Sequence, residues 1–419
     1  MFAERRPASA KRPLLALVES PAQLLHVLEY AAAHPAERLR AAVLAPTRTA
    51  DSDQLMALAE LARDAGLPVD WFEPRRSAAQ TAATALQLAR QTGRQLIVGD
   101  LFSGLIQSIL ILGRPAGVIA VDDGAATIES ARRLVEGRPL MRGRSRPAAW
   151  RRLAGTGLAS AARRTLADTK AVEFFTVMPI AGIISRRPGA RATRHHYAWI
   201  KAAEPSPAVR PGLDVVGSSL VAAGTVTAES YLTAVAALVA RHSTAPEDGQ
   251  AARQDTRQDT GQAAGQDAAR ETRQGAVRDS AVRDIRQGAG QGAGQGAERA
   301  NPVRYFAHRR ENPATLEALA KLGGIDIIRP ALPLELALRQ AGVSHRIVTL
   351  PTSTAFTLPV ALADLPVNVE LLRPDGQWID PTASHDAVAR LARLDRLASR
   401  HLPAADHGQP IPEGPYAVD

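Results

Sequence analysis

The chain has 419 residues, of which 45% are hydrophobic and 4% aromatic, and it carries a formal net charge of +9. This length suffices for two or three domains with cores built from Leu, Val, Ile and Ala. Cysteine is absent, which excludes disulfide bonds, thiolate metal sites and cysteine nucleophiles.

The chain up to Gly124 alternates apolar strands with amphipathic helices. Strands are predicted over residues 13–20, 39–46, 67–74, 94–101 and 116–124. Helices are predicted between them, over residues 21–34, 51–66, 77–93 and 103–113. Continuous apolar strands separated by helices are typical of a parallel sheet that is covered on both faces.

The segment that follows is rich in arginine. Residues 132–165 contain ten arginines and one acid, Glu136. This stretch is either a solvated surface or a site for an anionic partner, such as a phosphate-bearing substrate, an acidic polymer or an anionic membrane. Nucleic acid is not expected, because Trp150 is the one aromatic residue there that could stack on a base. The apolar run at 174–184 predicts a buried strand with its turn, or a surface that touches a membrane.

A second alternation begins near residue 213. It predicts strands over residues 213–220, 303–311, 325–330, 345–351, 367–374 and 377–381, and helices over residues 227–243, 313–324, 333–342 and 385–402. Residues 244–300 interrupt it with repeats of Gln, Gly, Ala, Asp and Arg. Such a composition cannot bury enough apolar surface to offset the entropy lost on ordering, so a disordered low-complexity insert is predicted.

The two alternations predict an α/β protein with two Rossmann-like, doubly wound domains that face a cleft, a GT-B-like architecture. The first domain is predicted over residues 1–205 and the second over 206–419, interrupted by the insert. In such sheets ligands bind beyond the carboxyl ends of the strands. The site is therefore expected in the cleft between the domains.

Polar residues and glycines follow the predicted strands in both domains. They are Ser20, Gln23, Asp100, Asp122, Asp123 and Gly124 in the first domain, and Gly217, Ser218, His308, Arg309, Arg310, Ser353 and Thr354 in the second. Each has a structural interpretation as well. Ser20 and Asp123 could cap helices, the glycines could allow tight turns, and His308 could be a partly buried histidine without chemistry.

Taken together, these residues predict the reaction centre of a nucleotide-sugar transferase. Two adjacent carboxylates offer a general base, because each raises the pKa of its neighbour. The run from His308 to Arg310 offers donors for a phosphate, and so do the hydroxyls and N–H groups at the helix start near Ser353. Glu335 could accept hydrogen bonds from ribose hydroxyls. No spacing of His, Asp and Glu suggests a metal site, and no dinucleotide or P-loop glycine motif is present.

The segments ESPAQL, VGDLFSGL, DDG, VGSSLV, YFAHRRE, LPLELAL and TSTAFTL resemble, in their order, motifs of bacterial sialyltransferases and α-2,8-polysialyltransferases of GT-B fold. The resemblance spans most of the chain outside the insert and residues 131–195. It implies inverting, metal-independent transfer of a sialic-acid-type sugar from a CMP donor to a glycan acceptor, without a further cofactor.

The resemblance also implies roles for single residues. Asp122 would deprotonate the acceptor hydroxyl, while Asp123 and Gly124 shape its loop. His308 would bind the phosphate of the leaving CMP, and so would Ser353 and Thr354. Further donor-side residues are Gly217, Ser218, Arg309, Arg310 and Glu335, and acceptor-side residues are Ser20, Gln23 and Asp100. Arg309 stands where the family usually has proline, which adds a charge and removes a restraint on the backbone.

Two alternatives stay open. The chain could be another GT-B enzyme that uses a UDP- or GDP-sugar, or a non-catalytic protein that binds acidic polymer or membrane through Arg132–Arg194. With the transferase, the same arginines would hold an anionic acceptor or the membrane that carries it. No apolar run is long enough to span a bilayer. A cytoplasmic protein is expected, peripheral at the inner membrane face if these arginines bind lipid.

Overall fold

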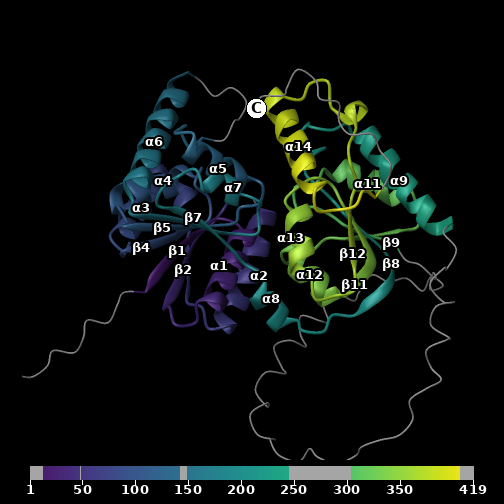
Figure 1. Ribbon diagram of the computed structural model, residues 1–419, viewed down its shortest axis with the longest axis horizontal. Helices are drawn as coiled ribbons and strands as arrows, with labels where there is room; N and C mark the ends of the chain where they lie inside the picture. Colours follow the sequence, from purple (N-terminus) through teal and green to yellow (C-terminus); the bar gives the residue numbers. More distant parts are fainter. Residues whose placement is uncertain (1–12, 48, 142–148, 245–302, 406–419) are drawn as a thin grey trace, which may run out of the picture.

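The computed structural model describes residues 13–47, 49–141, 149–244 and 303–405. Two parallel sheets, each with helices packed against it, lie side by side (Figure 1). This is the α/β architecture with two Rossmann-like halves that the alternating pattern predicted. The insert predicted at 244–300 lies outside the described residues, except for Thr244 at the end of a helix.

The first sheet has seven strands in the order β3-β2-β1-β4-β5-β6-β7, and every pair is parallel. The strands are β1 (Leu14–Val18), β2 (Leu39–Leu44), β3 (Val69–Phe72), β4 (Gln95–Val98), β5 (Gly117–Val121), β6 (Ala171–Thr176) and β7 (Ala190–Arg194). The helices are α1 (Pro21–Ala33), α2 (Thr49–Asp64), α3 (Ala78–Ala89), α4 (Gly104–Gly113), α5 (Ala126–Val135), α6 (Ala149–Asp168), α7 (Ala181–Ile184) and α8 (Ala198–Ala203), with a 3-10 turn η1 (Pro74–Arg76).

The second sheet has five strands in the order β10-β9-β8-β11-β12, again all parallel. The strands are β8 (Val209–Val216), β9 (Val303–Phe306), β10 (Ile325–Ile328), β11 (Val343–Thr349) and β12 (Asn368–Leu371). The helices are α9 (Ala228–Thr244), α11 (Pro313–Lys321), α12 (Leu334–Ala341), α13 (Thr354–Ala361) and α14 (His385–Ala398), with a 3-10 turn η3 (Gly376–Trp378).

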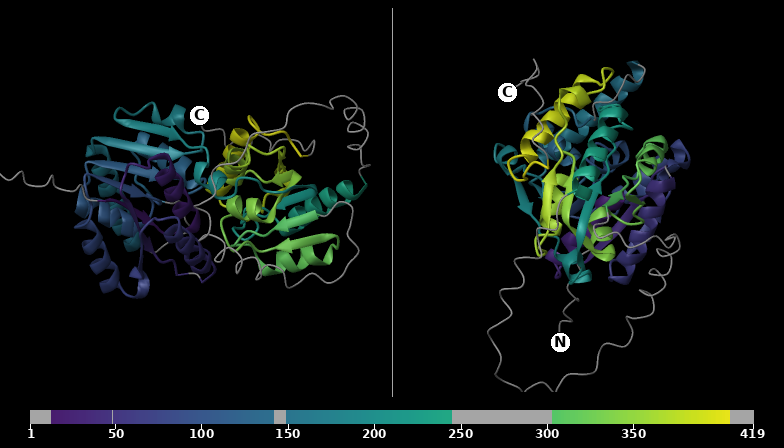
Figure 2. Two further views of the ribbon diagram at one scale, coloured as in Figure 1. Left: turned by 90° about the horizontal axis from the view of Figure 1, so that it is seen from below. Right: turned by 90° about the vertical axis from the view of Figure 1, so that its right-hand side faces the viewer.

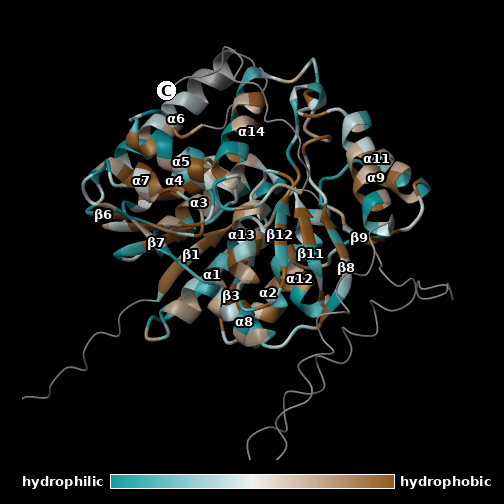
Figure 3. Ribbon diagram, turned by 45° about the vertical axis from the view of Figure 1, so that its right-hand side comes forward, coloured by the Kyte–Doolittle hydropathy of each residue, from teal (hydrophilic) through white to brown (hydrophobic). Residues whose placement is uncertain are grey.

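The inner strands β1 and β5 are apolar along their whole length because helices cover the sheet on both sides. All five residues of β5 are buried, and Figure 3 shows the strands as largely hydrophobic bands at the centre of each half. Two interpretations were given for the apolar run at 174–184, and the structure agrees with the buried strand and its turn. Phe174 and Phe175 in β6 are at most 1% exposed.

The strand predicted at 377–381 is wrong. The side chain of Asp375 accepts a hydrogen bond from the backbone N–H of Gln377 and starts the 3-10 turn η3 in its place. Ile379 makes a single bridge with Val226. An aspartate directly before the turn competes with strand formation, because its carboxylate accepts a hydrogen bond from a backbone N–H two residues later.

The two halves share buried surface and polar contacts. One cluster of buried apolar side chains runs from the first sheet into residues of the second half that include Phe306, Leu336 and Phe356. Gln54 donates to the carbonyl oxygen of Pro330 at 2.6 Å across the junction. Figure 2 shows the halves joined by the chain that leads from α8 into β8. The carboxyl ends of the strands of both sheets therefore meet at one junction.

Candidate functional site

The residues expected at the site lie at these carboxyl ends. Ser20 follows β1 and caps α1, since its hydroxyl oxygen accepts from the N–H of Gln23. Gly124 adopts a left-handed conformation with φ of +61°, and a Cβ atom built on it would lie 3.1 Å from the Ser353 Oγ atom. The loop after β5 thus touches the loop after β11. The structure brings the acidic motif and the Ser/Thr motif together across the junction.

Asp122 does not face this junction, which corrects the expectation that it would. Its side chain is fully buried. The Thr176 hydroxyl and the Val177 N–H donate to its two carboxylate oxygens. Burial alone would raise the pKa of Asp122, but its neighbours His195, His26 and Thr176 outweigh burial and hold that pKa below its ordinary value. In the structure this carboxylate has no exposed surface.

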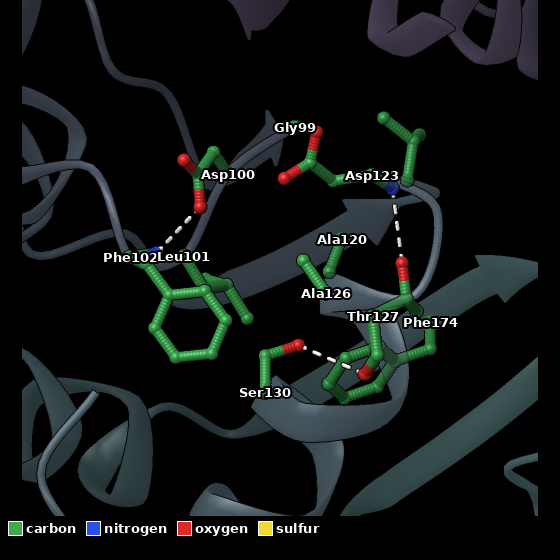
Figure 4. A pocket seen from close by; sticks show the side chains of 11 residues that line it. Gly99, Asp100, Leu101, Phe102, Ala120, Asp123, Ala126, Thr127, Ser130 and Phe174 are labelled. Carbon is green, nitrogen blue, oxygen red and sulfur yellow. Dashed lines mark hydrogen bonds between the residues drawn. The ribbon is translucent and has the colours of Figure 1, made fainter. Parts of the chain in front are cut away.

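Asp123 is the accessible member of the pair, and it does not cap the helix that follows. Its carboxylate accepts a hydrogen bond of 2.8 Å from Gln23 Nε2, and its N–H donates to the Thr127 hydroxyl. The residue before α5 is Ala125. Asp123 lines a small pocket that Asp100 also lines, and Figure 4 shows both carboxylates on the same side of it.

The side-chain amide of Gln23 fixes the position of the Asp123 carboxylate. Its Oε1 atom accepts the N–H of Glu19 at 2.7 Å, so its amide is fixed with Nε2 toward Asp123. A Cβ atom on Gly99 would lie 2.2 Å from Gln23 Oε1, which means that only glycine leaves room for this side chain. The sequence VGD at the end of β4 is therefore part of the support for the carboxylate.

The prediction missed Glu19, although it begins the segment ESPAQL. Glu19 accepts from the Ser103 hydroxyl at 2.8 Å and pairs with Arg75. Burial raises the pKa of Glu19, and the Arg75 charge and the Ser103 hydrogen bond partly oppose that rise. Its position after β1 was the signal that could have found it.

His308 lies at the end of β9 as a neutral imidazole. The N–H of Arg310 donates to His308 Nδ1 at 3.1 Å, so the ring proton is on Nε2. Burial and the charges of Arg309 and Arg310 lower the pKa of His308 to about 4. This side chain is therefore a hydrogen-bond donor at neutral pH and carries no charge of its own there.

Arg309 and Arg310 reach across the junction to the first half. Asp51, near the start of α2, lies 2.7 Å from Arg309 Nε and 3.5 Å from an Arg310 nitrogen. Sequence reasoning missed Asp51, because nothing local links it to β9. These ion pairs place two guanidinium groups beside His308.

Glu311 organises the same loop and was also missed. Its carboxylate accepts from the His308 N–H at 2.9 Å and from the Tyr305 hydroxyl. Burial raises the pKa of Glu311 to about 7, and the two hydrogen bonds limit the rise. A Cβ atom on Gly217 would lie 2.5 Å from Glu311 Oε2, so Gly217 is required for close packing of β8 against this carboxylate.

The remaining donor-side residues differ in how their polar atoms are used. The Ser353 side chain is half-buried beside Gly124, whereas the Thr354 hydroxyl bonds to those of Thr349 and Thr352. Ser218 is buried, and its oxygen accepts from the Leu220 N–H. Glu335, at the start of α12, accepts from the Thr357 hydroxyl at 2.5 Å. Burial raises the pKa of Glu335.

Several arginines of the arginine-rich region already have acidic or backbone partners. Arg132 and Arg133 pair with Glu129 on α5, Arg191 pairs with Glu173, and Arg187 donates to the carbonyl oxygen of Leu166. The side chains of residues 142–154 lie outside the described part. Within that part, no helix has both the length and the apolar character needed to cross a membrane.

Among the described residues, one group has donors placed for a metal ion, formed by His26, Asp122 and His195. The sequence analysis predicted no metal site. The three residues are far apart in the chain and meet only in the fold.

No protein-family model matches the chain, and no curated protein matches it. Solved structures with a similar fold include the α/β-galactoside α-2,3-sialyltransferase of Photobacterium phosphoreum, with 9% identity, a TM-score of 0.47 and coverage of 94% of this chain and 98% of that one. A putative UDP-N-acetylglucosamine 2-epimerase of Listeria monocytogenes has 11% identity, a TM-score of 0.45 and coverage of 95% and 93%. Similarity this weak does not identify the residues of a functional site in this chain.

Proposed function

We propose that the chain is a glycosyltransferase that moves a sialic-acid-type sugar from a CMP donor to a glycan acceptor, with inversion at the anomeric carbon. The observation that carries the proposal is the contact between the Gly124 loop and Ser353. The contact brings a pocket lined by carboxylates in the first half close to residues of the second half that can donate hydrogen bonds to a phosphate. The choice of CMP and of the sugar rests on the motif resemblance.

On the acceptor side, we assign the general base to Asp123 in place of Asp122. Asp123 lines the pocket, while Asp122 is sealed behind it. A base must come within hydrogen-bond distance of the hydroxyl it deprotonates. The hydrogen bond from Gln23 Nε2 orients the Asp123 carboxylate.

On the donor side, the leaving phosphate gains negative charge as the sugar becomes oxocarbenium-like. His308 Nε2–H, the Ser353 hydroxyl and the Arg309 guanidinium would donate to it, and fixed donors stabilise such developing charge. Arg309 would then exchange Asp51 for the phosphate. Attack from the first half and departure toward the second place the two groups on opposite faces of the sugar, which gives inversion.

The test of the base is Asp123→Asn, assayed by CMP release from CMP-sialic acid with neutral and sialylated glycan acceptors. Loss of a general base lowers kcat by about 10²- to 10⁴-fold, and the melting temperature should stay near that of wild type. The matched control is Asp53→Asn, an exposed aspartate on α2, which should keep full activity. Wild-type turnover by Asp123→Asn would refute the assignment.

The donor class is tested by thermal shift with CMP, UDP and GDP. CMP alone should raise the melting temperature, and His308→Ala should weaken that effect. Stabilisation by UDP or GDP without CMP would instead indicate another nucleotide-sugar enzyme. No nucleotide effect, together with salt-sensitive binding to an acidic polymer, would indicate a non-catalytic binder.

A further inference from the structure

Three buried side chains from separate elements converge behind the Asp123 loop. His26 lies within α1, Asp122 directly follows β5, and His195 directly follows β7. They are 3%, 0% and 4% exposed. One donor atom of each lies within 4.8 Å of the other two, and His195 Nε2 is 3.6 Å from Asp122 Oδ2.

Three imidazole nitrogens of this cluster are buried without a hydrogen bond of normal length among the described residues. They are His26 Nδ1 and both nitrogens of His195, and the His195 Nε2 atom lies 3.6 Å from Asp122 Oδ2. The His195 ring is held by packing instead: it stacks on Phe175 with centroids 4.8 Å apart and meets His26 edge-on at 5.0 Å. Buried polar atoms without partners are rare and costly, so each such atom calls for a ligand.

The carboxylate of the cluster has no lysine or arginine partner among the ion pairs of the described residues. The Thr176 hydroxyl and the Val177 N–H donate to it, and His195 Nε2 lies 3.6 Å from Oδ2. A compensating cation stabilises a buried carboxylate further than neutral donors do.

We propose that His26, Asp122 and His195 bind a divalent transition-metal ion. Two imidazoles and one carboxylate are a donor set that Zn²⁺, Co²⁺ and Fe²⁺ accept. Thr176 and Val177 already supply the outer hydrogen bonds that orient a liganding carboxylate. Since all three side chains are sealed, the ion enters during folding and acts structurally, by tying α1, β5 and β7 together beneath Asp123. This inference does not depend on the proposed reaction.

The test is metal content by mass spectrometry of untagged full-length protein, as purified and after unfolding with chelator and refolding with Zn²⁺ or Co²⁺. Wild type should hold about one ion per chain, and the Co²⁺ form should show visible ligand-field bands. His26→Gln and His195→Gln should each lower the bound metal at least about tenfold, as expected on loss of a ligand. The control is His196→Gln, the exposed neighbour of His195, which should keep it.

Two results would overturn the proposal. One is a folded wild-type protein that holds no Zn²⁺, Co²⁺ or Fe²⁺ after refolding with each ion. The other is a folded His195→Gln variant with wild-type metal content. If the variants fail to fold, metal content and the Co²⁺ bands of wild type and His196→Gln decide the question.

Discussion

The two adjacent aspartates of the DDG segment differ in exposure because successive side chains at a strand end point to opposite sides. Asp122 continues the buried side of β5, and Asp123 turns to the pocket. The sequence analysis predicted that Asp122 would face the junction, because the sequence does not show to which side of the strand end each carboxylate turns. That choice depends on Thr176 and Val177, which belong to another strand and its loop.

Glu311 makes stability depend on pH. Its pKa is about 7 in the folded protein, against an ordinary value of 4.5. Between these values the folded state holds more protons than the unfolded state, so the free energy of unfolding falls as pH rises. The full effect of such a shift is about 3 kcal/mol.

That effect is measured by urea denaturation at about pH 4 and about pH 8, which lie on either side of this window. Glu311→Gln should remove most of the Glu311 contribution, because the amide does not titrate. Glu317→Gln, an exposed residue on the following helix, is the control and should keep the wild-type profile. An unchanged profile in Glu311→Gln would assign the pH dependence to other groups.

At the scale of elements, most of the strands could be predicted because buried parallel strands are unbroken apolar runs. Contacts between elements could not be predicted in this way. Asp51 pairs with Arg309, and Gln23 bonds to Asp123, although each pair is distant in sequence. The candidate metal cluster was missed for the same reason, since α1, β5 and β7 each contribute a single ligand.

The substitution Gly99→Ala tests whether the end of β4 supports the Asp123 carboxylate through Gln23. In Gly99→Ala the new Cβ atom would lie 2.2 to 2.6 Å from Gln23 atoms, so Gln23 must move and Asp123 loses its hydrogen bond. Overpacking of this kind costs about 1–3 kcal/mol, and turnover should fall with it. The control is Gly93→Ala, where nothing lies within 4 Å. Equal turnover in both variants would show that Gln23 does not position the base.

At the scale of the whole molecule, the two halves are coupled through shared burial and charge. The apolar cluster that contains Phe306 and Leu336 continues into the first sheet. Arg393 on α14 lies 3.5 Å from Glu129 on α5, so a second ion pair adds to that of Asp51. Neither half keeps its full core without the other.

This coupling predicts one unfolding transition in scanning calorimetry. Separate domains usually melt separately, whereas a shared core makes them melt together. The calorimetric and van't Hoff enthalpies should therefore agree within error. Two resolved transitions would show that the halves unfold independently.

The connection between α9 and β9 has a consequence for protein engineering. In a parallel sheet the chain enters each strand at its amino end, while the candidate site lies at the carboxyl ends. Residues 245–302 therefore join the described chain on the side away from Asp123 and His308. A reporter domain or a short linker exchanged for them would be attached at a point remote from the pocket.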